Sequence, residues 1–339
     1  MIEINGEDGG GQILRSALSM SMITGQAFRM VNIRGKRSKP GLMRQHLTCV
    51  NASLEVCGGA ASGNEMHSTE LVFKPGEVKA GDYVFRIGTA GSTTLLFQTL
   101  LPALMLADGV SNLELHGGTH NPMAPSADFI KRAFLPQIRV MGVEVNFDCV
   151  RYGFAPAGGG CIKAEITPVA QLSELSIIER GERVSRKVMC LLANVRKAVG
   201  EKEVKMVKSL LNWPDDSYEL KICDDVDGSG NLLYIEEVYE NSVFHLTSHG
   251  MHSKSAEKVA AQCVKSYKMI TGSQAAVETR LVDQLLLPMA LAGSGQIKTV
   301  AMSNHILTNI KLIEKFRNIT FSLNRDLLGE IIIEIAAKH

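Results

Sequence analysis

The apolar stretch at Phe97–Pro102, FQTLLP, has a counterpart at Val282–Pro288, VDQLLLP, and this internal similarity predicts the fold. Each copy lies in an apolar helical pattern that ends near a glycine. Each is followed by a short strand, at Leu113–Leu115 or at Ile297–Val300. A polar loop, a second helix and two closing strands then follow both copies. The same order of elements therefore occurs at least twice.

The N-terminal part of the chain has the same plan. Its expected elements are a helix at about Gln12–Ile23, a strand at Phe28–Ile33, a helix at Leu42–Val56, and strands at Glu70–Phe73 and Tyr83–Ile87. The two later units are completed by the loops His116–Pro122 and Met302–His305, the helices Ala127–Val140 and Thr308–Phe316, and the strands Val143–Phe147, Ile162–Thr167, Thr320–Leu323 and Ile331–Ile335. We predict an α/β (α+β) fold of three repeated helix–strand–helix–strand–strand units. Ligands favour the strand ends of such folds.

A segment with a higher content of charged residues separates the second unit from the third. Residues 201–240 hold 15 charged residues in 40, whereas residues 280–310 hold three in 31. We interpret residues 181–273 as a smaller inserted α/β domain, and residues 1–180 with 274–339 as one large three-repeat domain. The alternative is one continuous domain with a charged surface region.

Composition excludes several classes of protein. With 45% hydrophobic and 21% charged residues the chain is typical of a soluble globular protein. A net charge of +1 and 5% aromatic residues argue against a general nucleic-acid coat and against extended stacking platforms. The seven cysteines include no CxxC pair, which favours reduced thiols in a cytosolic or nuclear compartment, and we expect a cytoplasmic location. We expect no signal peptide and no membrane span.

The stretch Gly9–Leu54 contains no Asp or Glu in 46 residues but holds seven cations. It opens with three glycines and Gln12, which lead straight into an apolar helical pattern. Backbone N–H groups at a helix start favour an anionic ligand, and glycines let a phosphate approach the main chain closely. The stretch therefore predicts a site for a polyphosphate or a nucleic-acid end. A basic face toward solvent or another subunit is the alternative.

Two kinds of side chain could carry chemistry at such a site. His305 follows an apolar strand at a predicted helix start, where a neutral imidazole can attack phosphorus. A hydrogen-bonded structural histidine is the alternative. Glu7 and Asp8 precede the glycines, and a carboxylate there suits Mg²⁺ or Mn²⁺. Acids at a helix start also simply favour its dipole. Arg34, Arg37 and Arg44 can grip phosphate with planar guanidinium groups.

Several ordered blocks together resemble the RNA 3′-terminal phosphate cyclase family. They are Gly9–Arg15, Arg34–His46, Pro156–Gly160, Asp283–Leu285 and the segment around His305. The resemblance covers nearly the whole chain, including the position of the inserted segment. It implies RNA processing by an ATP-dependent ligase-class enzyme that converts an RNA 3′-phosphate to a 2′,3′-cyclic phosphate. Adenylylation of His305 would give a covalent histidine–AMP and pyrophosphate, and an RNA-adenylate would then release AMP.

The resemblance also implies roles for individual residues. His305 would be the nucleophile, and Asp8 would hold the divalent metal. The residues expected to hold ATP and phosphates are Arg15, Arg34, Arg37, Gln45, Gln98, Arg280, Leu281, Val282, Asp283 and Gln284, with Pro125 and Phe129 near the adenine. The expected partners are ATP and RNA 3′-phosphate ends.

Three positions depart from the family pattern, and two other functions compete with the cyclase. Asp8 stands where the family usually has Glu, Tyr152 where it has Arg or His, and Arg280 where an aromatic residue is expected. One rival is a non-catalytic cyclase-like factor in ribosome assembly, which would lack the nucleophilic histidine. The other is an enolpyruvyl-type transferase, which phosphoenolpyruvate rather than ATP would stabilise.

Overall fold

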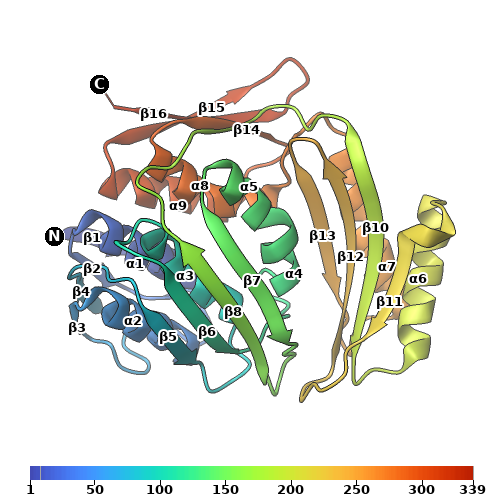
Figure 1. The fold of residues 1–339 in the computed structure, drawn as a ribbon, viewed down its shortest axis with the longest axis horizontal. Helices are drawn as coiled ribbons and strands as arrows, with labels where there is room; N and C mark the ends of the chain where they lie inside the picture. Colours follow the sequence, from blue (N-terminus) through green and yellow to red (C-terminus); the bar gives the residue numbers. More distant parts are fainter. Residues whose placement is uncertain (8, 339) are drawn as a thin grey trace.

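The computed structural model describes residues 1–7 and 9–338, and within them it forms four sheets of four strands (Figure 1). The predicted mixed α/β fold is confirmed. The first sheet has the strand order β1 (Ile2–Asn5), β2 (Phe28–Val31), β4 (Leu71–Lys74) and β3 (Ala60–Ser62). The order in the second sheet is β5 (Asp82–Arg86), β6 (Ser111–Gly117), β8 (Gly160–Thr167) and β7 (Glu144–Arg151). The order in the third sheet is β9 (Leu175–Ile177), β14 (Gly295–Thr299), β16 (Ile331–Ala337) and β15 (Ile319–Arg325).

The three sheets have the same pattern of parallel and antiparallel neighbouring strands. In each, the first two strands in the order are parallel and the other neighbours are antiparallel. Parallel neighbours need a crossover connection. The crossovers contain α1 (Gly10–Thr24), α3 (Thr93–Leu104) and, after the segment 181–273, α8 (Thr279–Ala292).

The predicted strand Tyr83–Ile87 does not close the first unit, as the sequence analysis expected. It is β5, which pairs in parallel with β6 and opens the second sheet. The first sheet is closed by β3, Ala60–Ser62. This strand is too short, and its residues are too small, to give a period-2 signal. Strand β9 was missed because it is only three residues long. Each unit therefore begins one strand earlier than predicted.

The helix boundaries follow from their caps. Helix α1 and helix α2 (Arg44–Cys57) end at Gly25 and Gly58, which adopt left-handed conformations at the predicted stops. Helix α9 (Asn304–Phe316) begins earlier than predicted, because Ser303 Oγ accepts the N–H of Ile306 over 3.1 Å. His305 therefore lies in a first helical turn and not in a loop.

The predicted helix Ala127–Val140 is a continuous helical segment that is interrupted by a π-helical turn. Its parts are α4 (Ala127–Phe129), the π-helical η1 (Ile130–Phe134) and α5 (Leu135–Val140). Within the described residues, no helix combines the length and the apolar character needed to cross a bilayer.

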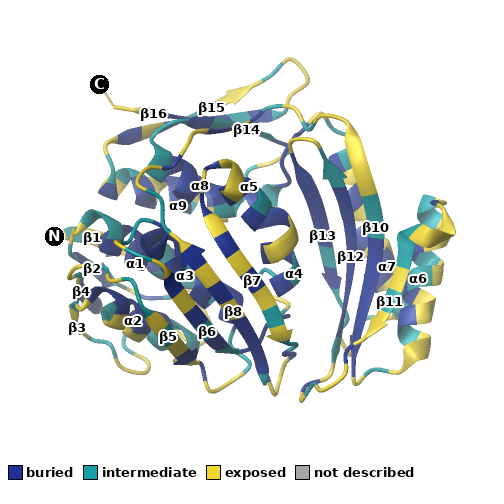
Figure 2. Ribbon diagram, viewed as in Figure 1, coloured by how far each residue is buried: buried dark blue, intermediate teal, exposed yellow. Residues whose placement is uncertain are grey.

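The main hydrophobic core joins the three similar sheets to the helices between them (Figure 2). Helices α1, α3, α8 and α9 pack against one another there. Leu14, Leu18, Phe97, Leu100 and Leu285 are fully buried in this core. Burial of large apolar side chains is the main stabilising term for such a fold. The core holds the starts of α1 and α9 next to each other.

The segment 181–273 contains the fourth sheet, in the order β11 (Tyr218–Ile222), β10 (Arg183–Ala193), β12 (Gly230–Tyr239) and β13 (Val243–His249). One face is covered by α6 (Lys197–Leu211) and α7 (Ala256–Thr271), while the 3₁₀ turn η2 (Asp215–Ser217) precedes β11. The other face carries Met189 and Leu191, which cluster with Phe154 from the large part of the chain. Because both faces of β10 are buried, its C-terminal half reads as a continuous apolar run.

Two arginines tie this segment to the rest of the chain. Arg132 in η1 lies 3.2 Å from Glu236 on β12. Arg151 at the end of β7 donates to both Asp225 and Asp227, at 3.1 and 2.9 Å. These ion pairs and the Phe154 cluster fix the position of β13, which forms one wall of the site described below.

A buried acid in the segment 181–273 should make the free energy of unfolding depend on pH. Glu203 on α6 is 1% exposed, and burial raises its pKa to about 7. Its carboxylate accepts hydrogen bonds from Asn231, over 2.6 Å, and from the Cys190 thiol, over 3.3 Å, which only partly offset that burial. An acid with a raised pKa in the folded state contributes stability below its unfolded pKa, which is lost as the pH rises through the folded value.

We therefore expect Glu203→Gln to raise the free energy of unfolding at about pH 8 by on the order of 3 kcal/mol, with little gain at about pH 4.5. Urea denaturation at both pH values measures it. Glu201→Gln, an exposed acid on the same helix, is the matched control. An equal effect of Glu203→Gln at both pH values would contradict the assignment.

Candidate active site

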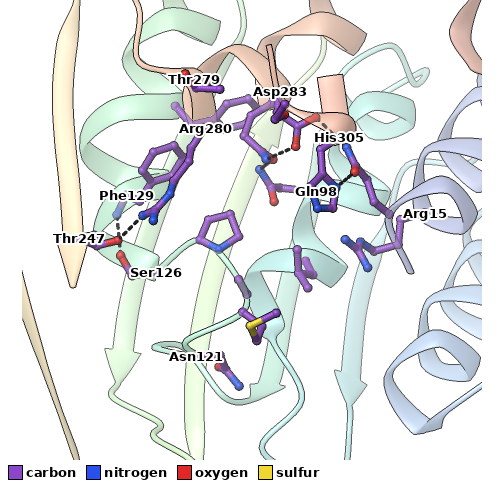
Figure 3. A pocket seen from close by; sticks show the side chains of 18 of the residues that line it. Arg15, Gln98, Asn121, Ser126, Phe129, Thr247, Thr279, Arg280, Asp283 and His305 are labelled. Atoms are coloured by element: carbon purple, nitrogen blue, oxygen red, sulfur yellow. Dashed lines mark hydrogen bonds between the residues drawn. The ribbon is translucent and has the colours of Figure 1, made fainter. Parts of the chain in front are cut away.

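A cavity of about 860 Å³ lies between the helices of the three-sheet part and strand β13 (Figure 3). This volume is in the range of small-molecule sites. Eight of the predicted site residues line it, namely Arg15, Gln98, Pro125, Phe129, Arg280, Asp283, Gln284 and His305. They come from α1, α3, the loop before α4, α4 itself, α8 and α9. The fold thus brings residues almost 300 positions apart in the sequence to one cavity.

The imidazole of His305 is held by a chain of two further side chains. Its Nδ1 contacts Oε1 of Gln12, and Gln12 Nε2 donates to Oδ1 of Asp283 over 2.7 Å. Because the carboxylate oxygen accepts, Gln12 turns its amide N–H toward Asp283 and its carbonyl oxygen toward His305. Nδ1 therefore carries the proton, and the lone pair of Nε2 is free to attack an electrophile.

Asp283 is itself fixed by neighbouring amides. Asn309 donates to its Oδ1 over 2.9 Å, and Gln284 donates to its Oδ2 over 3.3 Å. Gln98 in turn donates to Oε1 of Gln284. Burial raises the pKa of Asp283, while the charge of His305 and the hydrogen bond from Gln12 oppose that shift. The network joins α1, α3, α8 and α9 around the proposed nucleophile.

The start of α1 is built for a close approach of the main chain. Gly10 has φ +55°, and a Cβ there would lie 3.2 Å from Nη2 of Arg37. A Cβ at Gly11 would overlap Nε2 of His46. Among residues 1–7 and 9–338, no side chain caps this helix and no acid lies in its first turn. The free N–H groups and the helix dipole therefore favour an anion beside His305.

One positive side chain and one neutral side chain flank this anion site. Arg15 lines the cavity and donates to the carbonyl of Gly11 over 3.0 Å. Burial lowers the pKa of its guanidinium, and a bound anion would offset that cost. Burial, with the charges of Arg15 and Arg34, lowers the pKa of His46 to about 3. His46 is therefore neutral, and its Nδ1 accepts the N–H of Met43 over 3.3 Å.

Arg37 is not among the residues that line the cavity, but it lies beside the start of α1 and gives a testable prediction. Its guanidinium lies over Gly10, so Arg37→Ala removes a charge-assisted contact with an anion at the start of α1. We expect the substitution to weaken the binding free energy for ATP or for an RNA 3′-phosphate end by roughly 1–3 kcal/mol. Calorimetry measures both affinities. Arg29→Ala, which removes an exposed arginine paired with Glu70, is the control and should leave both affinities unchanged. Unchanged affinities in Arg37→Ala itself would refute a phosphate role.

The structure places the other predicted residues outside the cavity lining. Arg34 donates to the carbonyls of Lys39 and Gly41, at 2.7 and 2.9 Å, and so shapes the loop before α2. Gln45 exchanges two hydrogen bonds with the main chain of Ser92 at the start of α3. Leu281 and Val282 are fully buried in the core on the far side of α8. The ligand contacts expected of them stay predictions.

The predicted metal ligand Asp8 lies outside the described residues. The glycines at positions 153 and 158–160 pack closely against other parts of the chain. Gly153 and Gly160 approach each other so closely that a Cβ on either would overlap the other's backbone. Gly158 and Gly159 both have positive φ, and Gly159 lies against Asp227.

The far end of the cavity combines apolar and polar groups. Phe129 and Pro125 line it, and Arg280 Nη1 donates to Thr247 Oγ1 over 2.9 Å (Figure 3). This hydrogen bond joins α8 to β13 across the cavity. A flat guanidinium next to apolar side chains can stack on an aromatic base.

The sequence analysis missed the wall that segment 181–273 contributes. Thr247, Ser248 and His249 at the end of β13 line the cavity, as does Lys254. The Ser248 hydroxyl is buried and has no hydrogen-bond partner within the described part of the chain, and burial lowers the pKa of His249 to about 4. The run of polar residues at the end of an apolar strand was the available signal. The analysis also gave no role to Gln12, which directly follows the glycines.

The fold is that of a mixed α/β protein in which a histidine and an arginine line a cavity beside a glycine-rich helix start. The family model for RNA 3′-terminal phosphate cyclase matches residues 6–323. A protein named RNA 3′-terminal phosphate cyclase from Pseudomonas fluorescens is 46% identical over 93% of this chain and 92% of its own length. One of the same name from Ectopseudomonas mendocina is 45% identical, covering 94% and 93%. The chain therefore belongs to the RNA 3′-terminal phosphate cyclase family.

A solved structure of EPSP synthase from Acinetobacter baumannii aligns with 99% of this chain at 10% identity and a TM-score of 0.31. This chain spans 64% of that one. A similarity this low has no bearing on function.

Proposed function

We propose that this protein is an ATP-dependent cyclase of RNA 3′-terminal phosphates that works through a covalent histidine–AMP. The observation that carries the proposal is the hydrogen-bond chain from Asp283 through Gln12 to His305. This hydrogen-bond chain places the proton on Nδ1 of His305 and leaves Nε2 facing a cavity beside the start of α1. Two relatives that carry the cyclase name, at 45 and 46% identity, support it.

In the first step, Nε2 of His305 attacks the α-phosphorus of ATP. A phosphorus–nitrogen bond forms, the bond to the bridging oxygen of the β-phosphate breaks, and pyrophosphate leaves. Phosphate oxygens carry negative charge that repels a nucleophile, so catalysis needs positive groups where that charge develops. Arg15 and the N–H groups at the start of α1 supply them. Asp283 stabilises the positive charge that the imidazole gains.

In the second step, an oxygen of the RNA 3′-phosphate attacks the adenylyl phosphorus, and His305 leaves with its lone pair restored. The neighbouring 2′-hydroxyl then attacks the 3′-phosphorus. It loses its proton, AMP leaves, and the 2′,3′-cyclic phosphate closes. This last step is intramolecular and needs no further binding event, which lowers its entropic cost.

The cavity has room and chemistry for the nucleotide. Its volume of about 860 Å³ suits a ligand of this size. Pro125, Phe129 and Arg280 offer flat surfaces for the adenine, and Gln98 lies between that end and His305 (Figure 3). A Mg²⁺ or Mn²⁺ ion held by Asp8 would neutralise phosphate charge. The seven free thiols fit a reducing, cytoplasmic compartment.

The decisive experiment supplies an RNA oligonucleotide with a 3′-phosphate, ATP and Mg²⁺, and follows the end group by mass spectrometry. We expect loss of one water from the RNA, with one AMP and one pyrophosphate formed per cyclised end. Reactions without ATP, or with a 3′-hydroxyl oligonucleotide, are the controls. Cyclisation without ATP, or none with it, would refute the proposed function.

A further inference from the structure

We propose that the outer face of the second sheet holds a second metal site, for a thiophilic divalent cation such as Zn²⁺, built from Glu114, His116 and Cys161. Among the described residues these three form the one group of histidine, cysteine and acidic side chains with metal-ligand spacing. Their ligand atoms all lie within 4.8 Å of one another. The proposal is independent of the function proposed above.

The sheet itself places these side chains together. Glu114 and His116 are two residues apart on β6, so both point to the same face. Cys161 on β8 lies directly opposite His116 in the antiparallel pairing, where side chains approach most closely. The arrangement therefore rests on regular strand geometry and needs no loop to be fixed.

Hydrogen bonds already orient the ligand atoms. Glu114 Oε1 lies 2.7 Å from His116 Nε2, so these two atoms face each other at the centre of the group. The other carboxylate oxygen, Oε2, is held by Lys163 at 2.9 Å. An ion that replaces the proton between Glu114 and His116 would leave the Lys163 contact intact. Outer contacts of this kind fix ligand orientation in metal sites.

The ligand types select the ion. Thiolate, imidazole and carboxylate are the ligands of Zn²⁺, whereas Mg²⁺ takes oxygen ligands and keeps its water. The thiolate and the carboxylate together balance a double positive charge. Cys161 is 8% exposed and His116 and Glu114 are about 30% exposed, so an ion can enter from solvent and keep a water as its fourth ligand.

The position of the site gives it a consequence for the cavity. The pair His116–Cys161 is followed at once by Gly117–Gly160, the last pair of the β6–β8 ladder. The chain then enters the loop from Gly118 to Ser126, which lines the cavity from Asn121 onward. A bound ion would cross-link the two strands at the base of that loop and raise the melting temperature of the protein.

The test is a Co²⁺ titration of the full chain without nucleotide, in excess Mg²⁺ to fill oxygen-only sites. We expect one equivalent to give a near-ultraviolet thiolate-to-cobalt band that Zn²⁺ displaces. Cys161→Ser should abolish the band, whereas Cys149→Ser, which removes a thiol on β7, should retain it. His305→Ala should also retain it, because the site is separate from the cavity.

Glu114→Gln provides a second test in case Cys161→Ser does not fold. Glu114 is partly exposed, so its substitution should leave the protein folded. We expect it to weaken Co²⁺ binding at least about tenfold. No band in the parent chain, an equal band in folded Cys161→Ser, or unchanged affinity in Glu114→Gln would each overturn the proposal.

Discussion

His305→Ala is expected to abolish the covalent adduct with ATP and to lower the rate of RNA end cyclisation by at least about 10⁴-fold, because no other group takes over nucleophilic attack. His305 is exposed in the first turn of α9 and makes its side-chain contact with Gln12 alone among the described hydrogen bonds. The free energy of unfolding should therefore change by less than about 1 kcal/mol. Mass spectrometry of the intact protein after exposure to ATP measures the adduct.

The control is His252→Ala, an exposed histidine of segment 181–273 outside the cavity lining. It should form the adduct at the parent rate. Peptide mapping of the parent protein should place AMP on His305. Retention of the adduct in His305→Ala, or AMP mapped to another residue, would overturn the assignment of the nucleophile.

The sequence predicted the residues whose roles depend on local pattern. The glycines before α1, the strand before His305 and the matching stretches in α3 and α8 are all contiguous motifs. A motif of this kind specifies both the turn and the side chain that the turn presents. His305 was predicted from such a pattern, whereas Arg15, Gln98 and Asp283 were implied by the resemblance to the family. All four residues line one cavity.

The sequence did not predict what depends on tertiary context. Strand β3 is held by pairing with β4 and not by its own propensity, so Ala60–Ser62 carried no signal. Thr247 and Ser248 reach the cavity because ion pairs and a shared apolar cluster dock β13 there, and none of those contacts is local in the chain.

Gln12→Met is expected to lower the rate of adenylylation by on the order of 100-fold while leaving the affinity for ATP within a few-fold. Gln12 acts as a positioning residue, because it is the acceptor that fixes the proton on Nδ1 of His305. Methionine has a similar length but cannot accept a comparable hydrogen bond from Nδ1–H of His305, and it cannot donate one to Asp283. The loss of one charge-linked hydrogen bond corresponds to about 2–3 kcal/mol at the transition state.

Rapid-mixing measurement of adduct formation separates this effect from ATP binding. Ser16→Ala is the control, since Ser16 lies one turn further along α1, lines the cavity and donates to Asn309 over 2.7 Å without touching His305. We expect its rate to stay within about threefold of the parent rate.

Nitrogen NMR of labelled histidine gives a readout that general loosening of the site would not change. In the parent protein Nδ1 of His305 should carry the proton and Nε2 should be bare, and Gln12→Met should lose this preference. If Asp283 acts through Gln12, then Asp283→Asn should cost much less in the Gln12→Met background than alone, because the two residues form one chain. Additive losses, or an unaltered proton on Nδ1 in Gln12→Met, would show that another contact orients the imidazole.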